Sequence, residues 1–202
     1  MTQPRAPRDL REFLTLLRRE GELVEVEAEV SADLEVAEIH RRVIAAEGPA
    51  LLFKRVKGSP FPLTTNLFGN KRRVDLAFGR QSTEFISRIA RAPEELFPPK
   101  LGELWKNRDL LRAVMNAGTK SIRNGPVTEV CDRTPDLTQL PALKTWARDG
   151  GRFITLPLVE TRHPETGVSN LGMYRAQIYD STHLGAHIQI QRGGEGHLAV
   201  AE

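Results

Sequence analysis

Cysteine is almost absent from this sequence, and Cys131 is its one representative. A single thiol excludes an internal disulfide and any zinc site made of several cysteines. We expect it to be a small buried apolar residue rather than a nucleophile. Long apolar runs are also missing: no stretch of about 18 apolar residues exists, and none follows the basic start. We therefore expect a soluble, cytoplasmic protein with no membrane partner.

Aromatic residues and excess charge are scarce. The 202 residues include two Trp and two Tyr, and 29 basic and 26 acidic side chains are interspersed, leaving a net charge of +3. No basic run is interleaved with aromatic residues, as nucleic-acid binding surfaces often show. The sequence therefore predicts no nucleic-acid partner, and its length suits one large domain or two small ones.

Several catalytic motifs are missing as well. The chain contains no Gly-x-Gly-x-x-Gly, no phosphate loop ending in Lys-Ser/Thr and no Gly-x-Ser-x-Gly. A dinucleotide-binding Rossmann unit, a P-loop nucleotide hydrolase and a serine hydrolase of the nucleophile-elbow type therefore have no support. His183 and His187 are four residues apart, but Gly185 lies between them in a turn, so a helical zinc pair is not expected.

The N-terminal part of the sequence alternates between helix and strand patterns. Apolar residues at helical spacing follow the candidate N-cap Asp9, and Gly21 is a natural stop. Residues 23–30 alternate valine or alanine with glutamates, which predicts a strand with one buried and one acidic face. Ser31 or Asp33 is the expected cap of a second helix. The same periodicities predict strands around 50–53 and 63–67 and helices over 82–92 and 101–115.

From residue 116 onward the sequence favours strands. Gly and Pro punctuate residues 116–150, which contain one short β-like run over 127–131. Strands then follow over 153–161, 170–179 and 186–192, joined by turns at 163–167 and 180–185. A helix is expected after Gly194. These patterns predict an α+β protein, with an α/β region over 1–117 and a β-rich domain over 118–202.

Polar side chains that can hold a ligand are concentrated on the last two predicted strands. They are Asn170, Tyr174, Arg175, Gln177, His187, Gln189, Gln191 and Arg192, followed by Gly193-Gly194. Amide oxygens suit Mg2+, Mn2+ or an alkali cation better than zinc, and Arg and Gly N–H groups suit a phosphate. The pattern favours a phosphate-bearing cofactor with an oxygen-bound cation, while a β-meander with a solvated face explains the same residues.

One stretch, Asn170-Leu171-Gly172-Met173-Tyr174-Arg175, is distinctive in its context. Further motifs precede it in order: Asp9-Leu10-Arg11-Glu12-Phe13-Leu14, Gly21-Glu22-Leu23, Gly48-Pro49-Ala50-Leu51-Leu52-Phe53, Asn66-Leu67-Phe68-Gly69, Leu140-Pro141, Trp146, Asp149-Gly150-Gly151, Phe153-Ile154-Thr155 and Thr166-Gly167. Together they cover nearly the whole chain and closely resemble the UbiD family of prenylated-FMN-dependent (de)carboxylases.

The resemblance implies a split β-barrel flavin-binding domain of the flavin-reductase type, preceded by an α/β region and incomplete at its C-terminus. It implies a carboxy-lyase that catalyses reversible non-oxidative decarboxylation of an α,β-unsaturated or aromatic carboxylic acid. The implied cofactors are prenylated FMN and Mn2+ or Mg2+, with K+ as a further cation. The implied partners are a small carboxylic acid substrate, the flavin prenyltransferase that supplies the cofactor, and further copies of the chain in a homo-oligomer.

Residue roles carry over from the family by position. Asn170 matches an asparagine ligand of the metal that bridges to the flavin phosphate. Arg175 matches the arginine of the catalytic Arg-Glu network, which can orient a carboxylate. Gln191 stands where many members have a histidine metal ligand, and its oxygen suits Mn2+ or Mg2+. The matched cofactor-contacting residues are Met173, Tyr174, Arg175, His187, Ile188, Gln189, Arg192 and Gly193.

Two departures from the family keep alternatives open. Besides Gln191, the family's glutamate metal ligand and catalytic glutamates come from sequence beyond Glu202, so the chain as given holds half a metal site and no general acid. A truncated or degenerate flavin-binding or assembly module without its own catalysis is therefore an alternative. A plain scaffold domain is a third interpretation, which the clustering of polar groups on two strands disfavours.

The spacing of two candidate residues makes a structural prediction. Asn170 and Arg175 have opposite parity, so in a regular strand their side chains would face opposite sides. They can address one cofactor only where the backbone bulges, bends or leaves the sheet between them, and Gly172 permits this. We therefore expect a backbone irregularity near residues 171–174.

Overall fold

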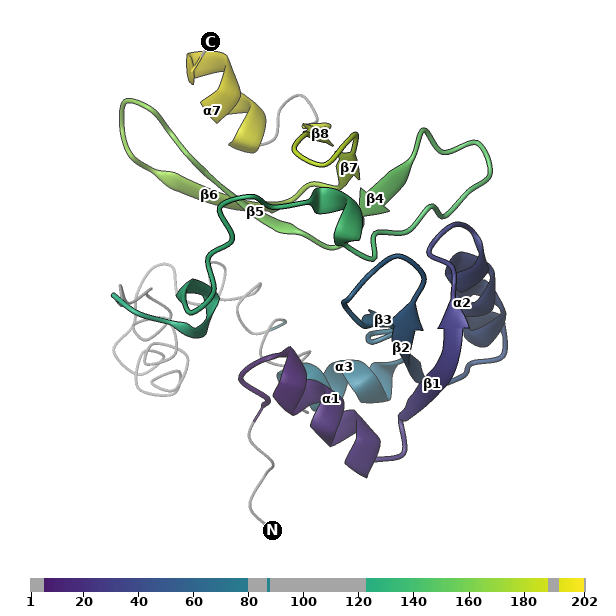
Figure 1. Ribbon diagram of the computed structural model, residues 1–202. Coiled ribbons are helices and arrows are strands. Elements are labelled where there is room, and N and C mark those ends of the chain that lie inside the picture. The colour runs from purple at the N-terminus through teal and green to yellow at the C-terminus, as the bar shows by residue number, and fades with distance from the viewer. Residues whose placement is uncertain (1–5, 80–86, 88–122, 189–192, 202) are drawn as a thin grey trace, which may run out of the picture. The chain divides into compact units, whose positions relative to one another are not determined.

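The computed structural model describes residues 6–79, 87, 123–188 and 193–201 (Figure 1). The chain divides into two compact units, residues 1–17 with 70–133 and residues 18–69 with 134–202. The domain boundary expected at 117/118 lies outside the described residues. So do the helices expected over 82–92, apart from Ser87, and over 101–115.

The first helix, α1 (Leu10–Arg19), confirms its predicted start and stop. The N–H of Glu12 donates to Asp9 Oδ1 at 2.8 Å, which satisfies one of the free donors of the first turn. Phe13 and Leu17 are the buried residues of the helix. Gly21 follows with a φ of 71°, a left-handed conformation that glycine adopts at little cost.

A three-stranded sheet, in the order β1-β2-β3, forms the core of the second unit. β1 (Leu23–Val30) is parallel to β2 (Ala50–Val56), and β3 (Leu63–Thr65) is antiparallel to β2. The connection between the parallel strands is α2 (Glu35–Ala45), which lies alongside the sheet (Figure 1). The buried residues of this core are Val30, Ala32, Val36, Leu51, Phe53 and Val56.

Strand β1 does not have the clean alternation of buried and solvated faces that the sequence predicts. Val24 is 47% exposed. Glu25, on the expected acidic face, is half-buried and lies 2.6 Å from the Lys54 ammonium. β1 is an edge strand that pairs with β2 alone among the described strands, and further along the strand its register shifts between Val26 and Glu29. Such a shift interrupts the two-residue period.

The start of α2 is also built differently from the prediction. Neither Ser31 nor Asp33 caps the helix with its side chain, since Leu34 occupies the N-cap position with a φ of 66° and no side-chain cap bond. Instead, the Ser31 N–H donates to Glu35 Oε2 at 2.6 Å, and Val36 N–H donates to the Ser31 carbonyl at 3.2 Å. The carboxylate of Glu35, the first residue of the helix, thus bonds to the backbone of Ser31, which precedes the helix.

Among the described residues of 70–133, one helix was not predicted from the sequence, and two predictions are wrong. Helix α3 (Lys71–Phe78), which the sequence did not predict, begins at Asn70, whose side chain accepts from the Arg73 N–H at 2.8 Å. The short strand expected over 127–131 is wrong, because η1 (Pro126–Thr128) is a 3-10 turn there. The expected burial of Cys131 is wrong too, since its thiol is exposed.

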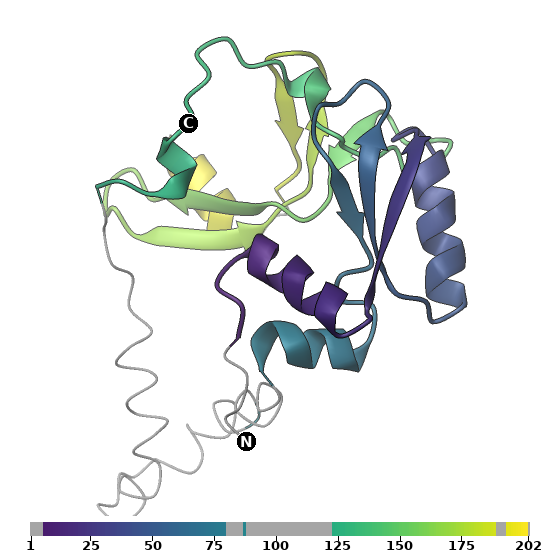
Figure 2. The ribbon, with the colours of Figure 1, turned by 60° about the horizontal axis from the view of Figure 1, so that its bottom comes forward.

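The described residues from 123 onward form five short strands where the sequence predicted three, and most of the third predicted strand, 186–192, lies outside them. β4 (Arg152–Ile154), β7 (Ala176–Ile178) and β8 (Leu184–Ala186) form one antiparallel sheet, in the order β4-β7-β8. β5 (Leu158–Arg162) and β6 (Ser169–Met173) form a separate ribbon. Helix α7 (Gly193–Ala201), which confirms the expected C-terminal helix, lies against this ribbon (Figure 2).

These elements confirm an α+β protein with small sheets. The described strands of residues 123–188 do not close into a barrel, so the split β-barrel stays a prediction. Within the described ranges, each helix is too short or too polar to cross a bilayer.

A short segment anchors β4 to the core of the second unit. The Lys144 N–H donates to the Ala32 carbonyl at 3.0 Å, and Leu143 packs against the core. The Phe153 N–H then donates to the Leu143 carbonyl at 2.9 Å. The sheet that carries β4 and β7 is thereby tied to buried structure.

Candidate functional site

A β-hairpin places Asn170 beside Thr161. In the β5–β6 ribbon Thr161 lies directly opposite Asn170. The hairpin closes where the His163 N–H donates to the Val168 carbonyl at 2.9 Å, and Gly167 has a φ of 69°. The predicted turn over 163–167 is thus confirmed, and it sets which residues face each other across the ribbon.

The chain changes sheet immediately after β6. β6 ends at Met173 and pairs with β5, whereas β7 begins at Ala176 and pairs with β4 and β8. Tyr174 and Arg175 belong to neither strand. The break therefore begins at Tyr174, the last residue of the range 171–174 in which we expected it, whereas Leu171, Gly172 and Met173 pair regularly with β5, so the bend expected at Gly172 is wrong. As a result, Asn170 and Arg175 line the same cavity despite their opposite parity.

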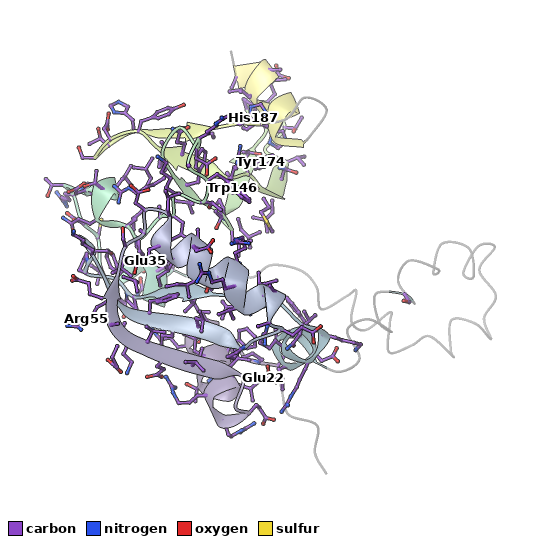
Figure 3. All side chains as sticks on the ribbon, turned by 90° about the vertical axis from the view of Figure 1, so that its right-hand side faces the viewer. Glu22, Glu35, Arg55, Trp146, Tyr174 and His187 are labelled. Carbon is purple, nitrogen blue, oxygen red and sulfur yellow. The ribbon has the colours of Figure 1, made fainter. Side chains whose placement is uncertain are left out.

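The cavity has a volume of about 610 Å3, within the range of small-molecule sites. Tyr174 and His187, labelled in Figure 3, both contribute to it. Its described lining is Asn170, Gly172, Met173, Tyr174, Arg175, His187 and Gly193. All of these except Gly172 are predicted site residues. The chain fold thus collects them in one place, while their roles stay predictions.

The remaining predicted site residues have different positions. Gln189, Gln191 and Arg192 lie outside the described residues. Ile188 is half-buried and lies near Gly194, since a Cβ atom at Gly194 would be 3.4 Å from Ile188 Cγ2. Ile188 therefore belongs to the packing between β8 and the start of α7.

The side-chain amide of Asn170 is held by two hydroxyl groups. Its Nδ2 donates to Tyr174 Oη at 3.4 Å and to Thr161 Oγ1 at 3.5 Å. Both amide protons are thereby used, and the carbonyl oxygen Oδ1 keeps its lone pairs. That oxygen faces the first residue of α7, because a Cβ atom at Gly193 would lie 2.4 Å from it.

Tyr174 connects this amide to α7. Its side chain is nearly buried, and its hydroxyl accepts from the Gly194 N–H at 3.1 Å. The ring lies against Gly172, where a Cβ atom would be 2.3 Å from Cε2. A larger residue at position 172 would therefore compete with the ring for the same space.

Sequence reasoning missed two residues of this network. Thr161 holds Asn170 as described, and Thr161 Oγ1 lies 2.9 Å from His197 Nδ1 on α7. The rings of His197 and His163 meet edge to face, with centroids 5.4 Å apart. Thr161 could have been found by counting residues back from the predicted hairpin turn. His197 carries no such signal, because it comes from an element 36 residues away.

Arg175 presents a cation at the cavity. Its guanidinium carbon lies 4.8 Å from the centre of the Phe153 ring. A cation over a ring face is attracted by the ring's electron density, and guanidinium N–H groups in such a contact can still donate to an anion. Phe153 comes from β4, which pairs with β7 directly after Arg175. The sheet change therefore also brings the cation over its aromatic support.

The described residues hold no group of three or more His, Cys, Asp or Glu side chains with metal-binding geometry. Of the two predicted ligands, the structure describes Asn170 only. The predicted metal thus rests on a single amide oxygen in this part of the chain. An oxygen of this kind suits a hard cation but does not bind one alone.

Comparison with protein families identifies the chain. The model of the 3-octaprenyl-4-hydroxybenzoate carboxy-lyase N-terminal domain, UbiD_N, matches residues 14–92. The model of the Rift-related domain of the same carboxy-lyase, UbiD, matches residues 119–202. The chain belongs to the UbiD family. The motif around Asn170 and Arg175 lies inside the second match, so the resemblance recognised in the sequence is confirmed.

Curated relatives are longer than this UbiD-family chain. A protein of Chlamydia pneumoniae, named as one of the subunits of a 4-hydroxybenzoate decarboxylase, is 47% identical over 193 residues, which cover 96% of the chain and 33% of that relative. An uncharacterized protein of Chlamydia trachomatis is 48% identical over 194 residues, with the same coverage. The chain therefore spans about a third of the length of these relatives.

Solved structures of UbiD-class enzymes have a similar fold. The enzyme HmfF from Pelotomaculum thermopropionicum, in complex with FMN, matches with a TM-score of 0.71 and 26% identity, covering 96% of this chain and 39% of that one. An evolved dimeric form of HmfF is in complex with prFMN. Vanillic acid decarboxylase from Sedimentibacter hydroxybenzoicus in its closed form matches with a TM-score of 0.72 and 26% identity, covering 98% and 40%.

Proposed function

We propose that this chain forms the N-terminal and cofactor-binding part of a UbiD-type carboxy-lyase. The reaction is reversible non-oxidative decarboxylation of an α,β-unsaturated or aromatic carboxylic acid, with prenylated FMN as cofactor. The observation that carries the proposal is the convergence of Asn170, Arg175 and His187 on one cavity of about 610 Å3. Residues 1–117 form the α/β region, and residues 118–202 begin a split β-barrel.

The described residues fit a flavin with an anionic tail. Gly193 has no side chain to displace Asn170 Oδ1, which would lie 2.4 Å from a Cβ atom there, and Arg175 brings a positive charge to the cavity. Prenylated FMN supplies the electron sink of the reaction when bound. Met173, Tyr174, Arg175, His187 and Gly193 line its site, and Ile188, Gln189 and Arg192 complete the proposed contacts.

Arg175 is the proposed catalytic residue of this chain. Its guanidinium carbon lies over the Phe153 ring, 4.8 Å from the ring centre. A planar cation in that position binds the substrate carboxylate through paired N–H bonds and orients it. In the Arg-Glu network that the family resemblance implies, the same cation would favour the ionised form of the partner glutamate.

A hard divalent cation completes the proposed site. Asn170 Oδ1 is suited to Mn2+ or Mg2+, because both protons of the amide are already donated to hydroxyl groups. Gln191 is the proposed second ligand, and K+ is a further cation of the site. With two neutral ligands, binding depends on the cofactor phosphate for anionic oxygens.

The proposed partners follow from the cofactor. A flavin prenyltransferase supplies prenylated FMN, a small carboxylic acid is the substrate, and the protein assembles with copies of itself.

Co-production with a flavin prenyltransferase tests the proposal. The protein as its gene encodes it should retain prenylated FMN, identified by absorbance and by the mass of the extracted flavin. It should also release CO2 from at least one acid in a panel of cinnamic-type and hydroxybenzoic acids. Arg175→Ala should lose about 100-fold in decarboxylation when compared at equal flavin content. Flavin binding without CO2 release from any acid would favour a non-catalytic module instead. A colourless protein would contradict the proposal.

A further inference from the structure

The hydroxyl of Tyr174 occupies a position between two elements of the site. It accepts from Asn170 Nδ2 on β6 and from the Gly194 N–H at the start of α7. Its ring is confined on both sides, because Cβ atoms at Gly172 and Gly194 would lie 2.3 Å and 3.0 Å from ring or hydroxyl atoms. This side chain therefore has little room to serve as a mobile ligand contact.

We propose that Tyr174 and Thr161 are positioning residues that together fix the orientation of the Asn170 amide, with His197 holding Thr161. The inference rests on the proposed function, in which Asn170 Oδ1 faces the cofactor phosphate or its cation. It reassigns Tyr174 from a cofactor contact to a support of Asn170. It also adds Thr161 and His197, which no sequence motif points to.

The donor inventory gives the physical reason. A carboxamide has two N–H donors and one carbonyl acceptor, so it can present either end to a ligand. Here the two hydroxyl groups accept hydrogen bonds from both N–H donors, so Oδ1 is the end of the amide that can meet a ligand. Thr161 uses one lone pair for Asn170, and its own proton can be donated to His197 Nδ1, 2.9 Å away. Turning the amide over would place its N–H2 group toward Gly193, and Oδ1 would then receive no bond from Thr161 as long as the Thr161 proton is donated to His197 Nδ1.

The chain provides a matched control for the hydroxyl of Tyr174. Tyr179, the other tyrosine, packs on Gly185 in the same way, since a Cβ atom at Gly185 would lie 2.5 Å from Tyr179 Cζ. Its side chain is exposed, and it does not line the cavity of Asn170. Tyr179→Phe therefore removes an equivalent hydroxyl without touching the proposed network.

The experiment measures the flavin dissociation constant of the protein as its gene encodes it, with FMN and Mn2+, well below the unfolding temperature. Asn170→Ala should weaken binding most. Tyr174→Phe and Thr161→Val, which keep the side-chain volume, should each weaken it about tenfold, as expected for supports of a ligand residue. Thr161→Ser, which retains a hydroxyl, and Tyr179→Phe should bind like the unmodified protein.

A second measurement separates this inference from the proposed function. The Asn170 side-chain amide protons and the Gly194 N–H can be followed by hydrogen exchange without any ligand. Both should exchange faster in Tyr174→Phe and not in Tyr179→Phe. If the unmodified protein binds no flavin, the proposed function is wrong. The exchange rates would still show whether Tyr174 fixes the orientation of the Asn170 amide. Unchanged exchange, or unchanged flavin affinity in Tyr174→Phe where Asn170→Ala weakens it, would overturn the inference.

Discussion

The ring of Tyr174 lies so close to Gly172 that a Cβ atom added at Gly172 would be 2.3 Å from Tyr174 Cε2. We predict that Gly172→Ala destabilises the protein by about 1–3 kcal/mol, as overpacking typically does. The ring cannot swing away without breaking the bond that the Tyr174 hydroxyl accepts from the Gly194 N–H. Denaturant unfolding measures the change.

Gly185→Ala is the control for this prediction. Its added Cβ would lie 2.5 Å from the Tyr179 ring, a clash of nearly the same depth. Tyr179, however, is 65% exposed and can turn toward solvent. We expect a loss below about 0.5 kcal/mol for this surface change. Equal losses in the two variants would show that the confinement of Tyr174 is unimportant.

Gly193 allows the start of α7 to approach Asn170. Gly193→Ala places a Cβ atom 2.4 Å from Asn170 Oδ1, so the amide must turn or the helix must move. We predict a loss of about tenfold in flavin affinity, comparable to the loss of a supporting residue at a ligand site. A flavin titration followed by fluorescence checks this. Gly196→Ala, in the same helix with nothing within 4 Å of the added carbon, should leave affinity unchanged.

Asn66 fastens the end of β3 to the turn before β2. Its Nδ2 donates to the carbonyls of Gly48 and Pro49 at 3.0 Å and 2.9 Å, and its φ is 58°. We predict that Asn66→Ala costs about 2–4 kcal/mol, from two partly buried acceptors losing their donor and from left-handed backbone strain. Asn66→Gly removes the bonds but relieves the strain. It should therefore be less damaging, and equal losses would assign the whole effect to the hydrogen bonds.

The lowered pKa of Glu38 predicts how the stability of the protein changes at acidic pH. Hydrogen bonds from Arg41 and then Arg42, with their charges, lower the pKa of Glu38 from 4.5 to about 2. A carboxyl group whose folded pKa is depressed contributes stability above its unfolded pKa, and this is lost as pH falls through the folded pKa. Glu38→Gln should thus be less stable at pH 7, with the difference shrinking between pH 4.5 and about 2.

Urea unfolding over that pH range measures the difference between the two proteins. The side chains are exposed, so the effect is small and should nearly disappear at about 1 M salt, where charges are screened within about 3 Å. A difference that persists to the lowest pH or in high salt would mean that Glu38 stabilises α2 by another route.

Local signals in the sequence predict local structure here. Asp9 and Gly21 bound α1 because a cap and a left-handed stop need only neighbouring residues. The hairpin at Gly167 follows from turn chemistry in the same way. The irregularity between Asn170 and Arg175 was also predictable, since parity forbids a shared site on a flat strand.

What the sequence did not predict depends on partners distant along the chain. The exposure of Val24 reflects the edge position of β1, which no local pattern encodes. The bond between Thr161 and His197 joins a hairpin strand to a later helix. The confinement of Tyr174 by Gly172 and Gly194 likewise requires the docked helix. Composition and periodicity carry no information about such contacts.

Because the chain changes sheet between β6 and β7, an insertion or deletion there has a different consequence from one at the hairpin tip. Extra residues at the hairpin tip, within 163–167, would extend a solvent-facing loop and leave the alignment of Thr161 with Asn170 intact. One residue added or removed between Met173 and Ala176 would instead invert which face every later side chain of β7 presents. Homologous sequences should therefore differ in length at the tip and keep the spacing from Asn170 to Arg175 invariant.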